Sequence, residues 1–443
     1  MSDRKKVVLL DGSRTPIASH GKDLRRVPVD KLTEHVMRNV LRRVGLSSEQ
    51  IDGVVWGCAY MTSLTPNLGR KAWLDAGFSA TTPAHTLHIQ CGSGMKTINT
   101  AMDQIWLGYG DIMLAGGAES MSTIPYLVDG QLRFEGKRGD RFPGFATQFD
   151  KSFMAKVIDW ISKKYDSGFI ATKLNKFFAN ASKYGPRPFI GMVDDGLLPT
   201  RFLWDMNTTH MSGTAQNVAD IYGITREEQD AFALRSQQRA IAARDSGRFD
   251  IEIDPIDTGR GVFGRDGHPR QTSLEKLAKL RGVNRTRDIT AGNASGINDG
   301  ACAVVIASEE AAQKIGAKPL AVLVDHIEKG VDPKTMGLGP VPAIQALLER
   351  NNLTLADVDL FEINEAFAAQ TLGCVKLLGI DMEKLNVNGG AIALGHPIAV
   401  SGARIILSLA HELKLRGKKR GIAALCIGGG MGIATLIENP DVA

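Results

Sequence analysis

Four side chains that could do chemistry stand beside glycines or at the ends of apolar runs: Cys91, Asn364, His396 and Cys426. Cys91 lies in LHIQCGSGM, where an apolar run meets a glycine-flanked serine. A strand ending at Ile89 or Gln90, followed by a helix, would place the thiol near a helix N-terminus, whose unpaired N–H groups and dipole favour the thiolate. Cys91 is therefore either a nucleophile or a small residue that fills a crowded strand–helix corner.

The other three positions also have an ordinary structural interpretation. Asn364 could cap a helix, His396 could be a satisfied histidine, and Cys426 could fill space beside a glycine hairpin. Each interpretation is reasonable for a single residue. Together they explain the set poorly, because two of the four residues stand at the ends of strands that belong to an internal repeat.

The repeat joins two distant parts of the chain. Residues 38–57 resemble residues 345–364, with Leu46 on Leu353 and Asp52 on Asp359, both 307 positions apart. Each copy predicts the end of an amphipathic helix, a short capped turn and an apolar strand. Residues 111–120 and 423–432 match in the same way, which indicates a duplicated α/β domain.

Helical patterns follow both Cys91 and His396. Their apolar positions are Met95, Ile98, Met102 and Ile105 in the first half, and Ile405, Leu409 and Leu413 in the second. Pro397 suits the first turn of the second helix. Alternating strand and helix signals predict buried sheets layered with helices.

Composition describes a globular chain of 443 residues with 43% hydrophobic and 23% charged residues, which excludes a disordered or fibrous protein. No apolar stretch approaches the roughly 18 residues of a membrane span, and the N-terminal apolar run is too short for a signal peptide. We expect a cytoplasmic protein. The five cysteines are widely spaced and lack zinc-ligand patterns, so we expect reduced thiols and no metal.

Several motifs in this order resemble the thiolase family, the acetyl-CoA C-acyltransferases. They are Cys91-Gly-Ser-Gly, Asn293-Ala-Ser-Gly-Ile-Asn-Asp299, Asn364-Glu-Ala-Phe, Gly395-His-Pro and Cys426-Ile-Gly-Gly-Gly430, supported by GGAESMS (116–122), HMSGTAQNVA (210–219) and MGLGPVPA (336–343). The resemblance covers nearly the whole chain except about 131–190.

The resemblance implies an α/β thiolase fold, in which duplicated βαβαβαββ domains form αβαβα layers. It places an N-terminal domain at 1–121 plus 298–318, a loop domain at 122–297 and a C-terminal domain at 319–443. It also implies a homodimer or homotetramer, a role in fatty-acid metabolism such as β-oxidation, and CoA or acetyl-CoA as substrate without a covalently bound cofactor.

The same resemblance assigns roles to the site residues. Cys91 would take the acyl group from a CoA thioester, His396 would accept the thiol proton, and Cys426 would serve as the second acid/base. One oxyanion site would use His396 and a water held by Asn364, and the other would use the N–H groups of Cys91 and Gly428. The residues implied to line the pantetheine channel are His210, Met211, Ser295, Met336 and Phe367.

Two other enzyme assignments stay open on the sequence. A ketoacyl-synthase-like condensing enzyme shares the fold and the nucleophile, although the Cys426 motif argues against it. A thiolase subunit of a membrane-associated fatty-acid oxidation complex is the other. Neither the acyl chain length nor the direction, thiolysis or Claisen condensation, follows from the sequence.

Three motifs depart from the family pattern. Gly282-Val-Asn follows Arg281 where Pro-Ala-Phe is usual, Ile-Ala-Val-Ser-Gly follows Pro397 where Leu-Gly-Ala-Ser-Gly is usual, and the last motif reads GGGMG in place of GGGQG. The first change affects a wall of the acyl or pantetheine pocket, and the second affects the fit beside His396.

Residues 131–190 are basic and aromatic, with 12 Lys/Arg against five acids and 12 of the 27 aromatic residues. Apolar stripes around Gly168 predict a helical hairpin. Such an insertion could lie on an anionic membrane surface or contact a partner, cover the active-site mouth, or be an extra packed hairpin. The basic residues match no nucleic-acid-binding motif.

Overall fold

The computed structural model describes residues 4–61, 66–124, 127–128, 193–194 and 210–442. The chain divides into a larger unit, Met1–Ile124 with Arg201–Ala443, and a smaller unit, Pro125–Thr200. In the smaller unit, β6 (Leu127–Val128) and β7 (Val193–Asp194) form an antiparallel pair. The predicted hairpin at 131–190 lies outside the described residues, so it stays a prediction.

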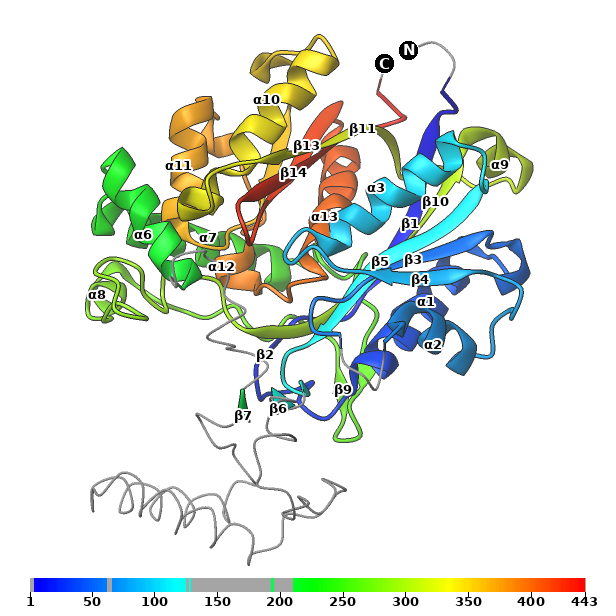
Figure 1. Cartoon of the computed structure of the whole chain (residues 1–443), viewed down its shortest axis with the longest axis horizontal. Helices are drawn as coiled ribbons and strands as arrows, with labels where there is room; N and C mark the ends of the chain where they lie inside the picture. Colours follow the sequence, from blue (N-terminus) through cyan, green and yellow to red (C-terminus); the bar gives the residue numbers. More distant parts are fainter. Residues whose placement is uncertain (1–3, 62–65, 125–126, 129–192, 195–209, 443) are drawn as a thin grey trace, which may run out of the picture. The chain divides into compact units, whose positions relative to one another are not determined.

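A mixed sheet runs through the larger unit (Figure 1). Its strand order is β4 (Ala84–Leu87), β3 (Gly53–Gly57), β5 (Ile112–Ser120), β10 (Asn298–Ser308), β1 (Val7–Arg14), β11 (Ala321–Gly330), β14 (Met431–Glu438), β13 (Arg420–Ile427) and β12 (Leu360–Ile363). The short β2 (Ala18–Ser19) pairs with β10, and β8 (Ile256–Asp257) and β9 (Val262–Phe263) form a separate hairpin.

The two halves of this sheet repeat one another. In the first half β3 runs parallel to β5, which is antiparallel to β10. In the second half β12 runs parallel to β13, which is antiparallel to β14. The halves join where β1 pairs with β11. The predicted duplication is confirmed, and the repeated segments begin with α1 (Val29–Val44) and η1 (Ser48–Gln50) in one half, and α10 (Pro340–Arg350) and η4 (Leu355–Asp357) in the other.

Helices cover both faces of each half-sheet. One cluster packs α1 and α2 (Leu68–Asp75) on the first half, and another packs α10 and α11 (Ala368–Leu378) on the second. Between them lie α3 (Ser93–Trp106) and α13 (Ser401–Arg416), side by side in Figure 1. All seven apolar positions predicted for these two helices are buried there. The predicted layered α/β fold is therefore confirmed.

The remaining helices flank the second half or connect strands. They are α6 (Met211–Tyr222), α7 (Arg226–Asp245), α8 (Leu274–Ala278), α9 (Glu309–Lys314), η3 (Pro333–Leu338), η5 (Met382–Lys384) and α12 (Ala391–Leu394). None of the helices in the described ranges is both long and apolar enough to cross a membrane.

Two predicted boundaries were wrong. The strand before Cys91 ends at Leu87 instead of Ile89 or Gln90, because the next residues leave the sheet: Ile89 N–H donates to the Ser93 hydroxyl. Pro397 does not occupy the first turn of α13, which begins at Ser401. Its carbonyl instead accepts the Val400 and Ser401 N–H groups in a preceding turn.

Candidate active site

Cys91 lies on a tight turn between β4 and α3. Gln90 has a φ of 52°, a left-handed conformation that non-glycine residues seldom adopt. The Ser93 hydroxyl donates to the Gln90 carbonyl oxygen over 2.7 Å and accepts the Ile89 N–H over 3.0 Å. The first residue of α3 thus fixes the turn that presents Cys91, as the predicted strand–helix corner requires.

The Cys91 thiol is held next to the end of β13. Burial raises the pKa of this thiol to about 11, although the backbone N–H groups of Gly428 and of Cys91 itself act in the opposite direction. Cys91 is accordingly a neutral thiol at pH 7 and requires a base to become a nucleophile.

The glycines around Cys91 have a role that the sequence did not reveal. A Cβ on Gly92 would lie 2.5 Å from the Ile427 side chain, and a Cβ on Gly94 would lie 2.5 Å from the Ala399 carbonyl oxygen. These glycines allow the Cys91 turn to approach the end of β13 and the segment that follows His396. They let three segments of the candidate site meet.

His396 is held by backbone and side-chain contacts. Its N–H donates to Asn298 Oδ1 over 2.9 Å, and the Asn298 amide donates to the Ala18 carbonyl oxygen of β2 over 3.1 Å. Its Nδ1 lies 2.6 Å from the Ser401 hydroxyl, which donates to the Pro397 carbonyl oxygen over 3.1 Å. We assign the Nδ1–H tautomer, since the single Ser401 hydroxyl proton is already donated to Pro397.

This tautomer leaves Nε2 of His396 as a proton acceptor. Nε2 is buried and has no hydrogen-bond partner in the described part of the chain. Burial, assisted by the positive charge of Arg404, lowers the pKa of His396 to about 4. The imidazole is therefore neutral at pH 7 and can act as a base.

Asn364 directly follows β12, and its N–H donates to the Ala424 carbonyl oxygen of β13. Its side chain is buried, yet neither Nδ2 nor Oδ1 has a hydrogen-bond partner among the described residues. Leaving such atoms unpaired costs about 1–3 kcal/mol. The amide is thus available to bind a ligand or a water molecule.

Cys426 is the last residue but one of β13, where burial raises the pKa of its thiol well above the usual range and the nearby Cys91 adds to the effect. It forms an apolar cluster with Met336 and Ala366, against which Met211 and Phe367 pack. Three of the five residues predicted to line the pantetheine channel therefore surround Cys426.

The other two predicted channel residues lie beside this cluster. Ser295 N–H donates to the Ala366 carbonyl oxygen over 3.0 Å, next to Phe367. His210 caps α6 directly before Met211, with Nδ1 accepting the Ser212 N–H over 3.1 Å. Partial burial lowers the pKa of His210.

The departure at Gly282-Val-Asn forms a tight turn. A Cβ on Gly282 would lie 1.8 Å from the Thr286 carbonyl oxygen, so this position cannot carry a proline or any other side chain without rearrangement. Asn284 has a φ of 48° and places its amide nitrogen 2.9 Å from Nδ1 of His210. An amide thus stands against the predicted channel residue where the family usually has an apolar or aromatic side chain.

Sequence reasoning missed three residues that position this site. Asn298 and Ser401 hold His396, as described above. Glu119 accepts the N–H groups of Ala59, Tyr60 and Ala399, and burial raises the pKa of its carboxyl to about 7. Asn298 and Glu119 stood inside quoted motifs, but each role depends on a contact with a distant part of the chain. Asn298 contacts His396, which follows it by 98 positions, and Glu119 contacts Ala399, which follows it by 280 positions.

A metal-ligand cluster does not occur in the part of the chain that the structure describes, where no three His, Cys, Asp or Glu side chains are grouped to hold an ion. The candidate site presents thiols, a neutral imidazole, a free amide and backbone N–H groups, which suit acyl transfer through a covalent intermediate.

Comparison with known proteins agrees with this geometry. Residues 7–179 and 191–310 match the family model "Thiolase, N-terminal domain", and residues 317–439 match "Thiolase, C-terminal domain". The acetyl-CoA acetyltransferases of Syntrophomonas wolfei and Escherichia coli K12 are each 40% identical over 441 residues, covering 98% of this chain and 99% of the relative.

Solved structures give the same result. The Bacillus anthracis acetyl-CoA acetyltransferase matches with a TM-score of 0.82 and 39% identity, covering 98% of this chain and 99% of that one. Human mitochondrial 3-ketoacyl-CoA thiolase in complex with CoA matches with a TM-score of 0.81 and 37% identity, covering 98% of both chains. The resemblance predicted from the motifs is confirmed: this chain belongs to the thiolase family of acyltransferases.

Proposed function

We propose that this chain catalyses CoA-dependent thiolysis of 3-ketoacyl-CoA and the reverse Claisen condensation with acetyl-CoA, through an acyl-enzyme on Cys91. The carrying observation is the Cys91 thiol, whose pKa is lowered by the backbone N–H groups of Gly428 and Cys91 and which lies close enough to Cys426 to affect the pKa of that second thiol. A reactive thiol, a second thiol and two convergent N–H donors are the groups that this reaction needs.

In the first step, Nε2 of His396 accepts the Cys91 thiol proton and the thiolate attacks C3 of the 3-ketoacyl group. The Nδ1–H···Ser401 hydrogen bond orients the imidazole and stabilises the cation that forms. The C2–C3 bond then breaks, leaving the shortened acyl group on Cys91 and the electron pair on the departing acetyl-CoA enolate.

Cys426 gives its proton to the C2 carbon of that enolate. Its raised pKa supports this role, because a thiol that stays protonated in the apolar cluster is available as an acid. The Cys426 thiolate then takes the proton of a second CoA thiol, whose sulfur attacks the acyl-enzyme thioester. Acyl-CoA leaves, and the Cys91 thiolate recovers its proton from His396. In the direction of condensation the same steps run in reverse, with the Cys426 thiolate removing a methyl proton of acetyl-CoA.

Two oxyanion sites stabilise the charge that develops on carbonyl oxygens. One uses the Cys91 and Gly428 N–H groups, and their lowering effect on the pKa of the Cys91 thiol supports this assignment. The other uses His396 with a water held by Asn364, whose unpaired buried amide supports this assignment. One such donor contributes about 3–4 kcal/mol to a transition state.

CoA binding is proposed along Met211, Met336 and Phe367, with His210 directly before Met211 and Ser295 hydrogen-bonded to Ala366 of the same cluster. The human neighbour solved with CoA supports this substrate class. The proposal also includes domain boundaries at 121, 297 and 318 and a dimeric or tetrameric assembly. It further includes a place in fatty-acid oxidation in the cytoplasm, and a membrane or partner contact through residues 131–190.

Replacing Cys91 by Ser tests the proposal directly. We expect CoA-dependent loss of the magnesium–enolate absorbance of acetoacetyl-CoA to disappear, while Cys302→Ala, which alters a buried cysteine of β10, keeps the activity. Unchanged thiolysis by the Cys91→Ser variant would refute the acyl-enzyme. A thiolysis series from C4 to C16 3-ketoacyl-CoA then defines the acyl chain length.

A further inference from the structure

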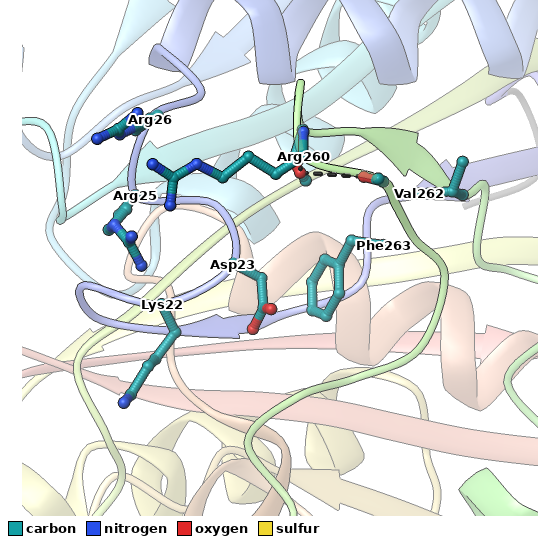
Figure 2. A pocket seen from close by; sticks show the side chains of 9 residues that line it. Lys22, Asp23, Arg25, Arg26, Arg260, Val262 and Phe263 are labelled. Atoms are coloured by element: carbon teal, nitrogen blue, oxygen red, sulfur yellow. Dashed lines mark hydrogen bonds between the residues drawn. The ribbon is translucent and has the colours of Figure 1, made fainter.

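A cationic pocket lies outside the site described above (Figure 2). It has a volume of about 330 Å³ and is formed by the loop after β2 and the hairpin β8–β9. Its lining residues are Lys22, Asp23, Arg25, Arg26, Thr258, Arg260, Gly261, Val262 and Phe263. A pocket of this size can hold a small organic ligand.

The loop that carries three of the cations is fixed by buried neighbours. Leu24 and Val27 are buried in the core beneath α1, while the intervening Arg25 and Arg26 are exposed. Two successive turns, Arg25 N–H to Lys22 O and Val27 N–H to Leu24 O, set this alternation. The charged side chains therefore stand on a rigid base.

The hairpin that carries Arg260 is also ordered by its own contacts. The Thr258 hydroxyl donates to the Gly261 carbonyl oxygen over 3.0 Å and accepts the Arg260 N–H over 3.3 Å. Phe263 anchors the hairpin by packing against the core. In Figure 2 the Arg260 side chain extends toward Arg25 and Arg26.

The charge of this pocket is unbalanced. Four cationic side chains face one carboxylate, Asp23, and none of the five forms an ion pair with another described residue. The guanidinium of Arg25 donates to the Gly21 carbonyl oxygen over 3.3 Å, while Lys22, Arg26 and Arg260 have no side-chain hydrogen bond among described residues. Uncompensated like charges gathered on rigid loops favour a bound anion.

We propose that this pocket binds a phosphate-bearing small molecule. Arginine pairs suit phosphate oxygens because their planar guanidinium groups donate two parallel hydrogen bonds. Val262 and Phe263 add an apolar wall against which an organic part of the ligand can pack. A nucleotide or another organic phosphate has both features. The pocket is separate from the residues proposed to hold CoA during thiolysis.

Equilibrium dialysis on the full chain tests this pocket, with inorganic pyrophosphate and ATP as probes. CoA is left out of the dialysis cell, because its own phosphate groups would compete for the pocket, and the arginine variants assign the bound probe to this pocket. We expect one molecule of probe per chain, and about tenfold weaker binding for each of Arg26→Gln and Arg260→Gln, because each removes one charged hydrogen-bond donor. Lys418→Gln, an exposed lysine elsewhere, is the matched control and should bind normally.

Comparison of the two probes, pyrophosphate and ATP, distinguishes an organic phosphate ligand from an inorganic one. Tighter binding of ATP than of pyrophosphate assigns the pocket to an organic phosphate, and equal binding assigns it to the phosphate groups alone; both support the proposal. Absence of binding, or binding unchanged in both arginine variants, overturns it. Flotation with phosphatidylserine vesicles that pyrophosphate cannot reverse would also overturn it, in favour of a membrane surface. Both variants should keep normal thiolysis, which shows that they fold.

Discussion

At the scale of single residues, the site contains polar atoms that the folded chain leaves unpaired. Nε2 of His396 and both amide atoms of Asn364 are buried without a hydrogen-bond partner among described residues. Proteins rarely leave buried polar atoms in this state, because each costs free energy. Their presence in two of the thiolase-like motifs indicates that the missing partners are substrate atoms or water.

Replacing Asn364 by Ala should slow turnover without lowering stability. The change removes a proposed oxyanion contact, so we expect kcat to fall about 10²–10³-fold. It also removes two unsatisfied buried atoms, so the free energy of unfolding should stay constant or rise. Steady-state thiolysis and urea denaturation measure the two quantities.

Asn386 provides the matched control for this substitution. Its amide is fully used: Oδ1 accepts the Ile363 N–H, and Nδ2 donates to the Ile363 carbonyl oxygen and to Glu365. Asn386→Ala should therefore lower the free energy of unfolding by about 1–3 kcal/mol. If Asn364→Ala destabilised the protein as strongly, its role would be structural.

The neutral state of His396 predicts a pH-dependent stability. Its pKa is about 4 in the folded protein against 6.5 ordinarily, so below pH 6.5 the unfolded chain binds a proton that the folded chain does not. The contribution of the neutral His396 imidazole to the free energy of unfolding is fully present above pH 6.5 and decreases as the pH falls toward 4. Relative to His396→Gln, the wild-type chain should lose about 2 kcal/mol between pH 8 and pH 5.

Urea denaturation of both proteins at several pH values gives this difference, and other titrating groups cancel in the comparison. A difference that stays constant from pH 8 to pH 5 would show that His396 is not held neutral by burial.

At the scale of elements, the close approach of α3 and α13 determines where the reactive groups meet. A Cβ on Gly94 would lie 2.5 Å from the Ala399 carbonyl oxygen, and a Cβ on Gly402 would lie 2.3 Å from the Met95 nitrogen. These contacts are with backbone atoms, which cannot move aside as a flexible side chain can. The absence of side chains therefore allows the N-terminal ends of the two helices to touch.

Gly94→Ala should accordingly disturb both the core and the site. Overpacking of this kind costs about 1–3 kcal/mol, and displacement of the Ala399 segment should move His396 and reduce kcat. Gly330→Ala is the control, because no atom lies within 4 Å of the added Cβ. Thermal unfolding and thiolysis should both remain normal in the control, and normal behaviour of Gly94→Ala would refute the packing role of this glycine.

At the scale of the whole molecule, periodicity and repeated segments predicted much of the larger unit. The apolar positions of α3 and α13 and the duplicated strand ends were visible because they recur at fixed spacing along the chain. The roles of Asn298, Ser401 and Glu119 were not visible, since each depends on which loops the fold brings together. The local break at Gln90 was missed because its left-handed backbone is stabilised by Ser93, three residues later.

The duplication makes a prediction that links both halves. Asp52 Oδ2 accepts the N–H groups of Asp111 and Ile112 at the start of β5, and Asp359 Oδ2 accepts those of Lys419 and Arg420 at the start of β13. The repeated aspartates thus tie equivalent strands to the loops that precede β3 and β12. Charged acceptors of this kind contribute about 1.5–3 kcal/mol per hydrogen bond at most, and less when solvent reaches them.

Asp52→Ala and Asp359→Ala should therefore lower the free energy of unfolding by similar amounts, each about 1–3 kcal/mol. Urea denaturation of the two variants measures this free energy. Asp257→Ala is the control for loss of a surface carboxylate, because Asp257 of β8 is exposed and accepts one local N–H. A large effect in one half with none in the other would show that the repeated residue has kept its structural role in only one copy. Equal effects in both halves would identify the aspartate as a strand-start contact retained in both copies of the duplicated domain.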